Sequence, residues 1–263
     1  IYMKEYDKYL KLLKEKYPTK QSVYRELINL NAIMNLPKGT EHFMSDLHGE
    51  YDAFYHIINN CSGVIREKVA MLYGDELTVY EQQELCTLIY YPREKLSILM
   101  DENKVNDEWY RNVLNQLIQI AKLLSSKYTR SKVRKAMPVD FAYIIDELIH
   151  AQKDEDDNRS VYHRQIMETI LSLHNGDEFL VALTDLIKRL AVDHLHILGD
   201  IYDRGSHADK ILDLLMEHHS VDIQWGNHDI LWMGAFCGNP VCMALVVRNN
   251  IKYKTCLLYT SPS

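Results

Sequence analysis

The chain has 263 residues, of which 47% are hydrophobic and 25% charged, a composition that is typical of a folded globular protein and excludes a disordered tail. Its formal net charge of -7 argues against general binding to nucleic acid or to an anionic membrane, because both need clustered Lys and Arg. An anionic substrate would have to be held by a local device, such as metal ions or a well-placed arginine.

The five cysteines show no C-x-x-C spacing, so they predict neither a disulfide framework nor a zinc knuckle, and they fit a reducing cytoplasm. The sequence has no apolar run of about eighteen residues that could span a bilayer, and residues 1–16 are too charged for a signal-peptide core. We expect a soluble, unexported protein. Both ends look incomplete, since Ile1 stands where an initiator Met would, so we also expect a fragment.

The first sixty residues predict two helices and then a strand-loop-helix unit. Apolar residues recur at helical spacing up to Pro18 and again up to a breaker at Pro37. Residues 41–45 predict a strand, residues 46–49 a tight loop, and residues 50–59 a helix.

Residues 61–190 predict an almost wholly helical block. Thr78 and Glu81 have the spacing of a capping box, and a long apolar periodicity runs from Trp109 to Leu124. We interpret this block as a helical insertion. The acidic run 154–158 within it is expected to be a solvated loop without a metal.

Strand-helix alternation resumes after the block. A predicted strand over 192–198 runs into the loop 199–205, and after a helix a second strand over 221–225 runs into 226–229. Three loops rich in metal-ligand side chains therefore follow three predicted strands. Because ligands bind at the carboxyl ends of strands in α/β sheets, we expect the three loops to form one site.

The residue types in these loops are those of a divalent-metal site. Side chains alternate in an extended segment, so Asp46 and His48 should converge on one ion while Leu47 points into the core. The two carboxylate oxygens of Asp200 could bridge two cations, and Asn227 offers a neutral oxygen. Such mixed ligation suits Mn²⁺, Fe²⁺ or Zn²⁺ better than a thiolate site does.

The loop sequences SDLHGE at 45–50, GDIYDRG at 199–205 and GNHD at 226–229 resemble, in order, the three signature blocks of the calcineurin-like metallophosphoesterases. The long helical insertion between the first two blocks is similar to that of fructose-1,6-bisphosphatase class III, a bacterial gluconeogenic enzyme family that uses Mn²⁺. The segments NLPKGTEHFMSDLHGEYDAF and VDHLHILGDIYDRG also resemble this family, from about residue 6 to about residue 253.

The resemblance implies an α/β fold in which a calcineurin-like metallophosphatase sandwich core, truncated here, carries a large all-helical insertion. Residues 1–60 would form the first part of the core with its leading helices, 61–190 the insertion, and 191–253 the second part of the core. Residues 254–263 would be a tail outside the family.

The resemblance also implies two metal ions, Mn²⁺ by preference. Asp46 and His48 would hold the first ion, Asp200 would bridge both, and Asn227 would hold the second. The family's remaining metal histidines lie further along the chain, and from about Lys254 this sequence neither resembles the family nor supplies a histidine. We therefore expect an N-terminal fragment whose second metal keeps only two of its protein ligands.

Three further positions would perform the chemistry. His228 would face the scissile bond as a general acid, oriented by Asp203, and Arg204 would bind the phosphate oxygens. After the arginine the family usually has a proline, whereas this chain has Ser206 and His207.

The implied reaction is hydrolysis of the 1-phosphate of fructose 1,6-bisphosphate to fructose 6-phosphate in gluconeogenesis, by a cytoplasmic phosphoric monoester hydrolase; this fragment alone would be weak or inactive. The partner would be a sugar bisphosphate, with no nucleic acid and no membrane, and a homo-oligomer stays open. Alternatives are a protein serine/threonine phosphatase or dinucleoside polyphosphate hydrolase, or an inactive regulatory module.

Several other residues are given a structural interpretation. His194 and His196 lie at strand spacing and are expected to be packed or hydrogen-bonded strand residues, not ligands. The basic run 127–135 is interpreted as a solvated helix face, although a phosphorylated ligand would need such a patch.

Overall fold

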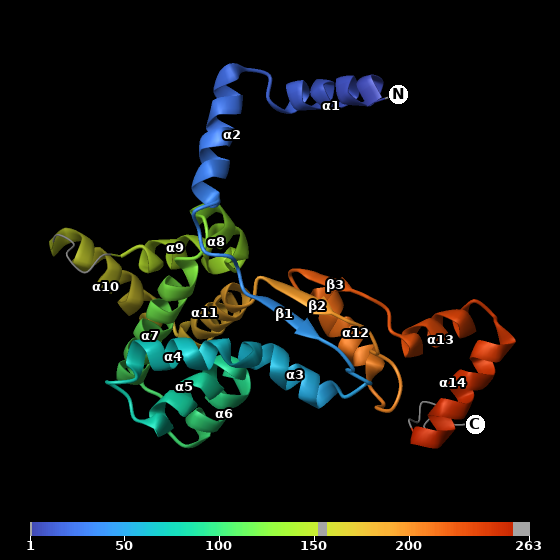
Figure 1. Ribbon diagram of the computed structural model, residues 1–263. Coiled ribbons are helices and arrows are strands. Elements are labelled where there is room, and N and C mark those ends of the chain that lie inside the picture. The colour runs from blue at the N-terminus through green and yellow to red at the C-terminus, as the bar shows by residue number, and fades with distance from the viewer. Residues whose placement is uncertain (1, 152–156, 255–263) are drawn as a thin grey trace.

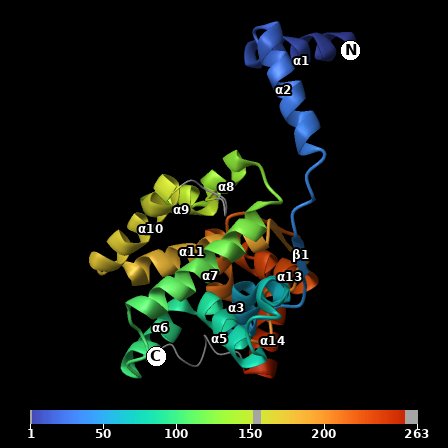
Figure 2. The same ribbon diagram turned by 90° about the vertical axis from the view of Figure 1, so that its left-hand side faces the viewer.

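The computed structural model describes residues 2–151 and 157–254. Its first helices, α1 (Tyr2–Lys16) and α2 (Lys20–Ile33), project away from the remaining elements (Figures 1 and 2). Thr19 caps α2 with a capping box. None of the described residues of α2 is buried, and Ile28 is 71% exposed. Both predicted helices are therefore present, but α2 contributes no residue to either core of the described part of the chain.

The centre of the molecule is a three-stranded parallel sheet in the order β1-β2-β3 (Figure 1). One face is covered by apolar contacts to two helices, and its core includes Phe54, Leu195, Ile197, Ile211 and Leu215. The elements are β1 (Glu41–Met44), β2 (His194–Ile197), β3 (Val221–Ile223), α3 (Tyr51–Asn60) and α12 (Ala208–Glu217). The predicted strands are thus confirmed, each shortened by one to three residues.

The other face of the sheet carries polar side chains and one exposed aromatic ring. Phe43 on β1 is 62% exposed, and His194, His196 and Asp222 lie on the same face of β2 and β3. Parallel sheets are usually covered on both faces. In the described part of the chain, this face of the sheet therefore lacks the covering layer that parallel sheets usually have.

Residues 61–151 and 157–191 form the predicted helical block, in the lower left and upper left of Figure 1. Its core is continuous and apolar, with Leu114, Leu117, Ile120, Phe179 and Leu183 fully buried. The elements are η1 (Cys61–Gly63), α4 (Val64–Tyr73), α5 (Val79–Tyr90), α6 (Pro92–Asp101), α7 (Asp107–Ser125), α8 (Arg130–Ala136), η2 (Val139–Phe141), α9 (Ala142–Ile149), α10 (Asp157–Ser172) and α11 (Gly176–Ala191).

Local signals explain several ends of these helices. The Thr78 hydroxyl accepts from the backbone N–H of Glu81, and the Glu81 carboxylate accepts from the backbone N–H of Thr78, which confirms the capping box at α5. The periodic run from Trp109 lies on α7, whose apolar stripe faces the core. The basic run falls on and before α8, where only Val133 is buried, in agreement with a solvated face.

The block is joined closely to the sheet. Helix α11 runs almost directly into β2, and Tyr128 donates to the carbonyl of Leu190 at 3.1 Å. Lys132 forms an ion pair with Asp193, just before β2. The block therefore positions the start of the central strand.

The last helices, α13 (Asn227–Phe236) and α14 (Pro240–Tyr253), pair with each other at the right of Figure 1. Among their described residues only Asp229 is buried, and Phe236 is 94% exposed. None of the helices in the described part of the chain has the length and apolar character needed to cross a membrane. Three of the sequence-based expectations fall at least partly outside the described residues: the acidic run from Asp154, Cys256, and the tail after Lys254.

Candidate functional site

The three predicted loops meet at the carboxyl edge of the sheet. The backbone N–H groups of Asp46, His48 and Gly49 donate to the carbonyls of Gly199, Asp200 and Ile201, at 3.2, 2.8 and 2.8 Å. The first loop therefore continues the pairing of β1 with β2 beyond the strands. This pairing brings residues that are about 150 positions apart in the sequence into register.

Glycines allow this close approach. Gly199 has φ of +99°, and a Cβ there would overlap the backbone of Gly226. Gly49 has φ of +70°, and a Cβ there would meet the carbonyl of Gly205 at 2.5 Å. Only residues without a side chain fit at these two crossings.

Five of the seven predicted site residues have left-handed backbone conformations, with positive φ at Asp46, His48, Asp200, Asp203 and Arg204. This corrects the expectation that Asp46 and His48 converge because side chains alternate along an extended segment: β1 ends at Met44, and the two residues lie in a strained turn. Non-glycine residues at such φ values cost free energy and concentrate at functional sites.

Donor atoms of Asp46, His48 and Asp200 all lie within 4.8 Å of one another. His48 is buried, its Nδ1 lies 3.3 Å from the carbonyl of Tyr202, and its Nε2 lies 3.5 Å from Asp46 Oδ1. A proton on Nδ1 would be donated to this carbonyl, which would leave the lone pair of Nε2 available to a metal ion beside the carboxylates. This is the arrangement of a histidine prepared to bind a metal.

Asn227 is exposed at the first position of α13, and among the described residues no hydrogen bond or ion pair joins its side chain to Asp46, His48 or Asp200. Its neighbour connects the loops instead, because the backbone N–H of His228 donates to Asp200 Oδ1 at 3.2 Å. The role of Asn227 as a ligand stays a prediction.

His228 and Asp203 form a close pair, with His228 Nδ1 2.7 Å from Asp203 Oδ2. The Asp203 carboxylate is buried and also accepts from Asn249 at 3.2 Å. The rings of His228 and His48 meet edge to face with centroids 5.7 Å apart. The predicted orienting residue therefore contacts the predicted acid, beside the cluster of metal-type donors.

Arg204 is exposed, and its guanidinium lies 5.9 Å from the centroid of the Tyr253 ring on α14. From this exposed position the planar guanidinium could bind an anion from solvent. The role of Arg204 in phosphate binding stays a prediction.

The sequence analysis missed Asp229. This fully buried carboxylate accepts four backbone N–H groups, from Asp200 and Gly226 at 2.8 Å, Ile201 at 2.9 Å and Tyr202 at 3.1 Å. It thereby fixes the second loop to the third. Its position as the last residue of GNHD, after Asn227 and His228, could have indicated from the sequence that it belongs to the site.

A cavity of about 530 Å³ lies away from this site, at the junction between the helical block and the sheet. Its lining includes Lys188, Leu195, His218 and His219. Burial, followed by the neighbouring His219, lowers the pKa of His218 to about 4. This histidine is therefore neutral at physiological pH and belongs to the packing of the junction.

Taken together, these features define an α/β protein with a cluster of carboxylate and imidazole donors, and an Asp–His pair beside it, at the carboxyl edge of a parallel sheet. Residues 8–259 match the family model of the Firmicute fructose-1,6-bisphosphatases, and the chain belongs to that family. The match extends past residue 253, where the resemblance read from the motifs ends.

Curated relatives carry the name fructose-1,6-bisphosphatase class 3. The chain is 54% identical to one from Clostridium beijerinckii over 261 residues, which cover 95% of this chain and 39% of the relative. It is also 54% identical to one from Listeria monocytogenes over 246 residues, covering 94% and 38%. The chain thus spans less than two fifths of the length of these relatives. No solved structure matches it.

Proposed function

We propose that this chain forms the metal-binding part of a fructose-1,6-bisphosphatase that hydrolyses the 1-phosphate of fructose 1,6-bisphosphate to fructose 6-phosphate. One observation carries the proposal: donor atoms of Asp46, His48 and Asp200 lie within 4.8 Å of one another, beside the 2.7 Å contact between His228 and Asp203. The names of the relatives supply the substrate.

The donor set fits divalent metal ions. Asp46 and His48 would hold the first ion, Asp200 would bridge, and Asn227 would hold a second ion, with Mn²⁺ preferred for such oxygen-rich ligation. When bound, the ions would activate water and neutralise phosphoryl oxygens. We expect this chain to bind about one Mn²⁺ well, because three of the proposed ligands, Asp46, His48 and Asp200, converge on one ion.

The remaining residues would act on the phosphate ester directly. Because Nδ1 of His228 faces Asp203, its Nε2 is the atom that would donate a proton to the leaving alkoxide. Arg204 would bind the phosphate oxygens through its guanidinium fork.

The wider assignments follow from the same family. We place the sheet in a calcineurin-like core, with the helical block as an insertion between its two parts. The free cysteines among the described residues, Cys61, Cys86, Cys237 and Cys242, support a reducing cytoplasm.

Phosphate release in the presence of Mn²⁺ tests the proposal, with fructose 1,6-bisphosphate, a phosphopeptide and a dinucleoside tetraphosphate as substrates. The assay is run on this chain and on the same chain joined to the remaining sequence of the Clostridium beijerinckii relative, hereafter the extended chain. We expect the extended chain to prefer fructose 1,6-bisphosphate and this chain to be feeble. Preference for the phosphopeptide or the tetraphosphate would reject the substrate, and no activity of the extended chain on any of them would favour a regulatory module.

A further inference from the structure

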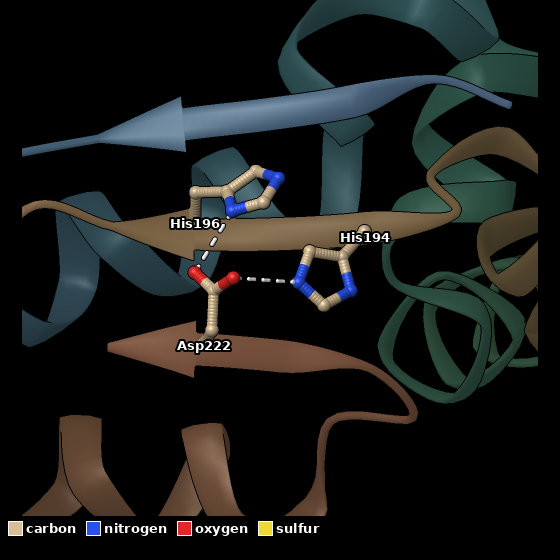
Figure 3. Close-up of side chains that lie close together, drawn as sticks. All are labelled: His194, His196 and Asp222. Carbon is tan, nitrogen blue, oxygen red and sulfur yellow. Dashed lines mark hydrogen bonds and ion pairs between the residues drawn. The ribbon is translucent and has the colours of Figure 1, made fainter. Parts of the chain in front are cut away.

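A second cluster of metal-type donors lies on the open face of the sheet. His194 and His196, two residues apart on β2, point to the same side, and Asp222 on β3 reaches between them (Figure 3). Ligand atoms of the three side chains lie within 4.8 Å of one another. The sequence predicts hydrogen-bonded strand histidines here, which the structure confirms, but it does not reveal Asp222 as their common partner.

The distances between the donor atoms suit a tetrahedral ion. Asp222 Oδ1 lies 2.8 Å from His196 Nδ1, and Asp222 Oδ2 lies 3.2 Å from His194 Nε2. Zinc–ligand bonds of about 2.0–2.1 Å at tetrahedral angles separate neighbouring ligand atoms by roughly 3.3 Å. Small side-chain movements would therefore place one carboxylate oxygen and two ring nitrogens around a single ion.

Neighbouring groups orient both rings. His194 Nδ1 lies 2.6 Å from the hydroxyl of Ser220, which can accept a proton from Nδ1 when an ion replaces the proton that Nε2 shares with Asp222. The ring of His196 stacks on Phe43 with centroids 4.4 Å apart and an interplanar angle of 13°. Outer contacts of this kind fix the tautomer and orientation of metal-binding histidines.

Glu41 completes the surroundings of His196. Its Oε2 lies 4.0 Å from His196 Nε2, the ring nitrogen that faces away from Asp222. That nitrogen is buried and has no hydrogen-bond partner in the described part of the chain. A proton on Nε2 would face this carboxylate and leave Nδ1 unprotonated, on the side of Asp222. Glu41 would therefore stabilise the proton on Nε2 once an ion replaces the proton that Nδ1 donates to Asp222 at 2.8 Å.

We infer that His194, His196 and Asp222 form a second divalent-metal site, selective for Zn²⁺ or Co²⁺ and separate from the site at the carboxyl edge of the sheet. Two imidazoles and one carboxylate suit these borderline ions better than Mn²⁺. An ion held here connects β2 to β3 on the face that the helices leave open. The inference does not depend on the proposed phosphatase function.

Co²⁺ is the probe, since tetrahedral Co²⁺ absorbs far more strongly in the visible region than the six-coordinate ion of an oxygen-rich site. Titration of this chain should produce a visible band that saturates at one equivalent and is displaced by Zn²⁺ but not by equal Mn²⁺. His196→Gln and Asp222→Asn should each weaken Co²⁺ binding at this site by about a hundredfold or more, and Ser220→Ala by about tenfold.

Asp222 is exposed at the surface, so Asp222→Asn should fold even if His196→Gln does not. His174→Asn, which changes an exposed histidine in a left-handed turn of the helical block, is the matched control and should leave the band unchanged. Absence of a strong band in the unaltered chain, or a band that survives Asp222→Asn with unchanged affinity, would overturn the inference.

Discussion

The helical block and the α13–α14 pair are both built of helices, yet they are held in place differently. Most of the sixteen residues of α11 in the block are buried, including Phe179, Leu180 and Leu183. The described residues of α14 include none that is buried, and α13 buries only Asp229. The block is stabilised by apolar packing, whereas the start of α13 is held to the site by hydrogen bonds to the carboxylates of Asp229 and Asp200.

The two kinds of contact contribute to different properties of the chain, its stability and the geometry of its site. Apolar burial is summed over many contacts and stabilises the whole block, while the position of His228 depends on a few directed bonds. Changes in the two regions should therefore produce different kinds of defect.

The largest effect on stability is expected from Leu117→Ala, which opens a cavity in the fully buried core of the block. The free energy of unfolding should fall by about 2–5 kcal/mol, measured by denaturant unfolding. Ile28→Ala on the exposed face of α2 is the control and should change it by less than about 0.5 kcal/mol. Comparable losses in the two variants would mean that α2 is packed in solution.

His228→Ala should slow phosphate release by the extended chain by about a hundredfold or more, the usual scale for a general acid, without loss of Mn²⁺. Asp200→Asn should lose both activity and Mn²⁺, whereas Asp101→Asn, at the exposed end of α6, should lose neither. If His228→Ala also lost Mn²⁺, the residue would be a ligand and the division of roles at this edge would be wrong.

Asp229→Asn tests the hydrogen-bonded region with almost no change in volume. The amide replaces one acceptor oxygen, so at least one pair of backbone N–H groups loses its partner. Mn²⁺ affinity should fall by about 10–100-fold, and the free energy of unfolding by about 1–3 kcal/mol. The control is Asp209→Asn in the first turn of α12. Unchanged Mn²⁺ affinity in calorimetric titration would show that Asp229 does not position the site.

The smallest effect concerns the junction between the block and the sheet. The pKa of His218 is lowered to about 4 in the folded chain, below its ordinary value of 6.5, chiefly by burial. The unfolded chain therefore binds the proton first, and the free energy of unfolding should decline as the pH falls from about 6.5 to about 4. Because the ring keeps some solvent access, we expect a loss of about 1–2 kcal/mol.

Thermal unfolding at pH 7 and pH 5 measures this effect. His218→Gln should reduce the difference between the two melting temperatures, and His174→Asn should leave it unchanged. Equal pH dependence in His218→Gln and the unaltered chain would assign the acid sensitivity to other groups.

The sequence by itself determined the α/β alternation, the helical block and the positions of the three loops, because helical periodicity, breakers and the Thr78 capping box are local signals. It also brought Asp46, His48 and Asp200 into one group, since the ends of parallel strands meet at one edge.

Only the tertiary structure decided how these residues meet. The left-handed turns at Asp46 and His48 depend on pairing with a loop about 150 residues away, and the four bonds to Asp229 come from two loops. Asp222 faces His196 because the strand register places them opposite each other. Register and loop contact are non-local, and a sequence pattern of period two or 3.6 carries no information about which distant residue lies opposite.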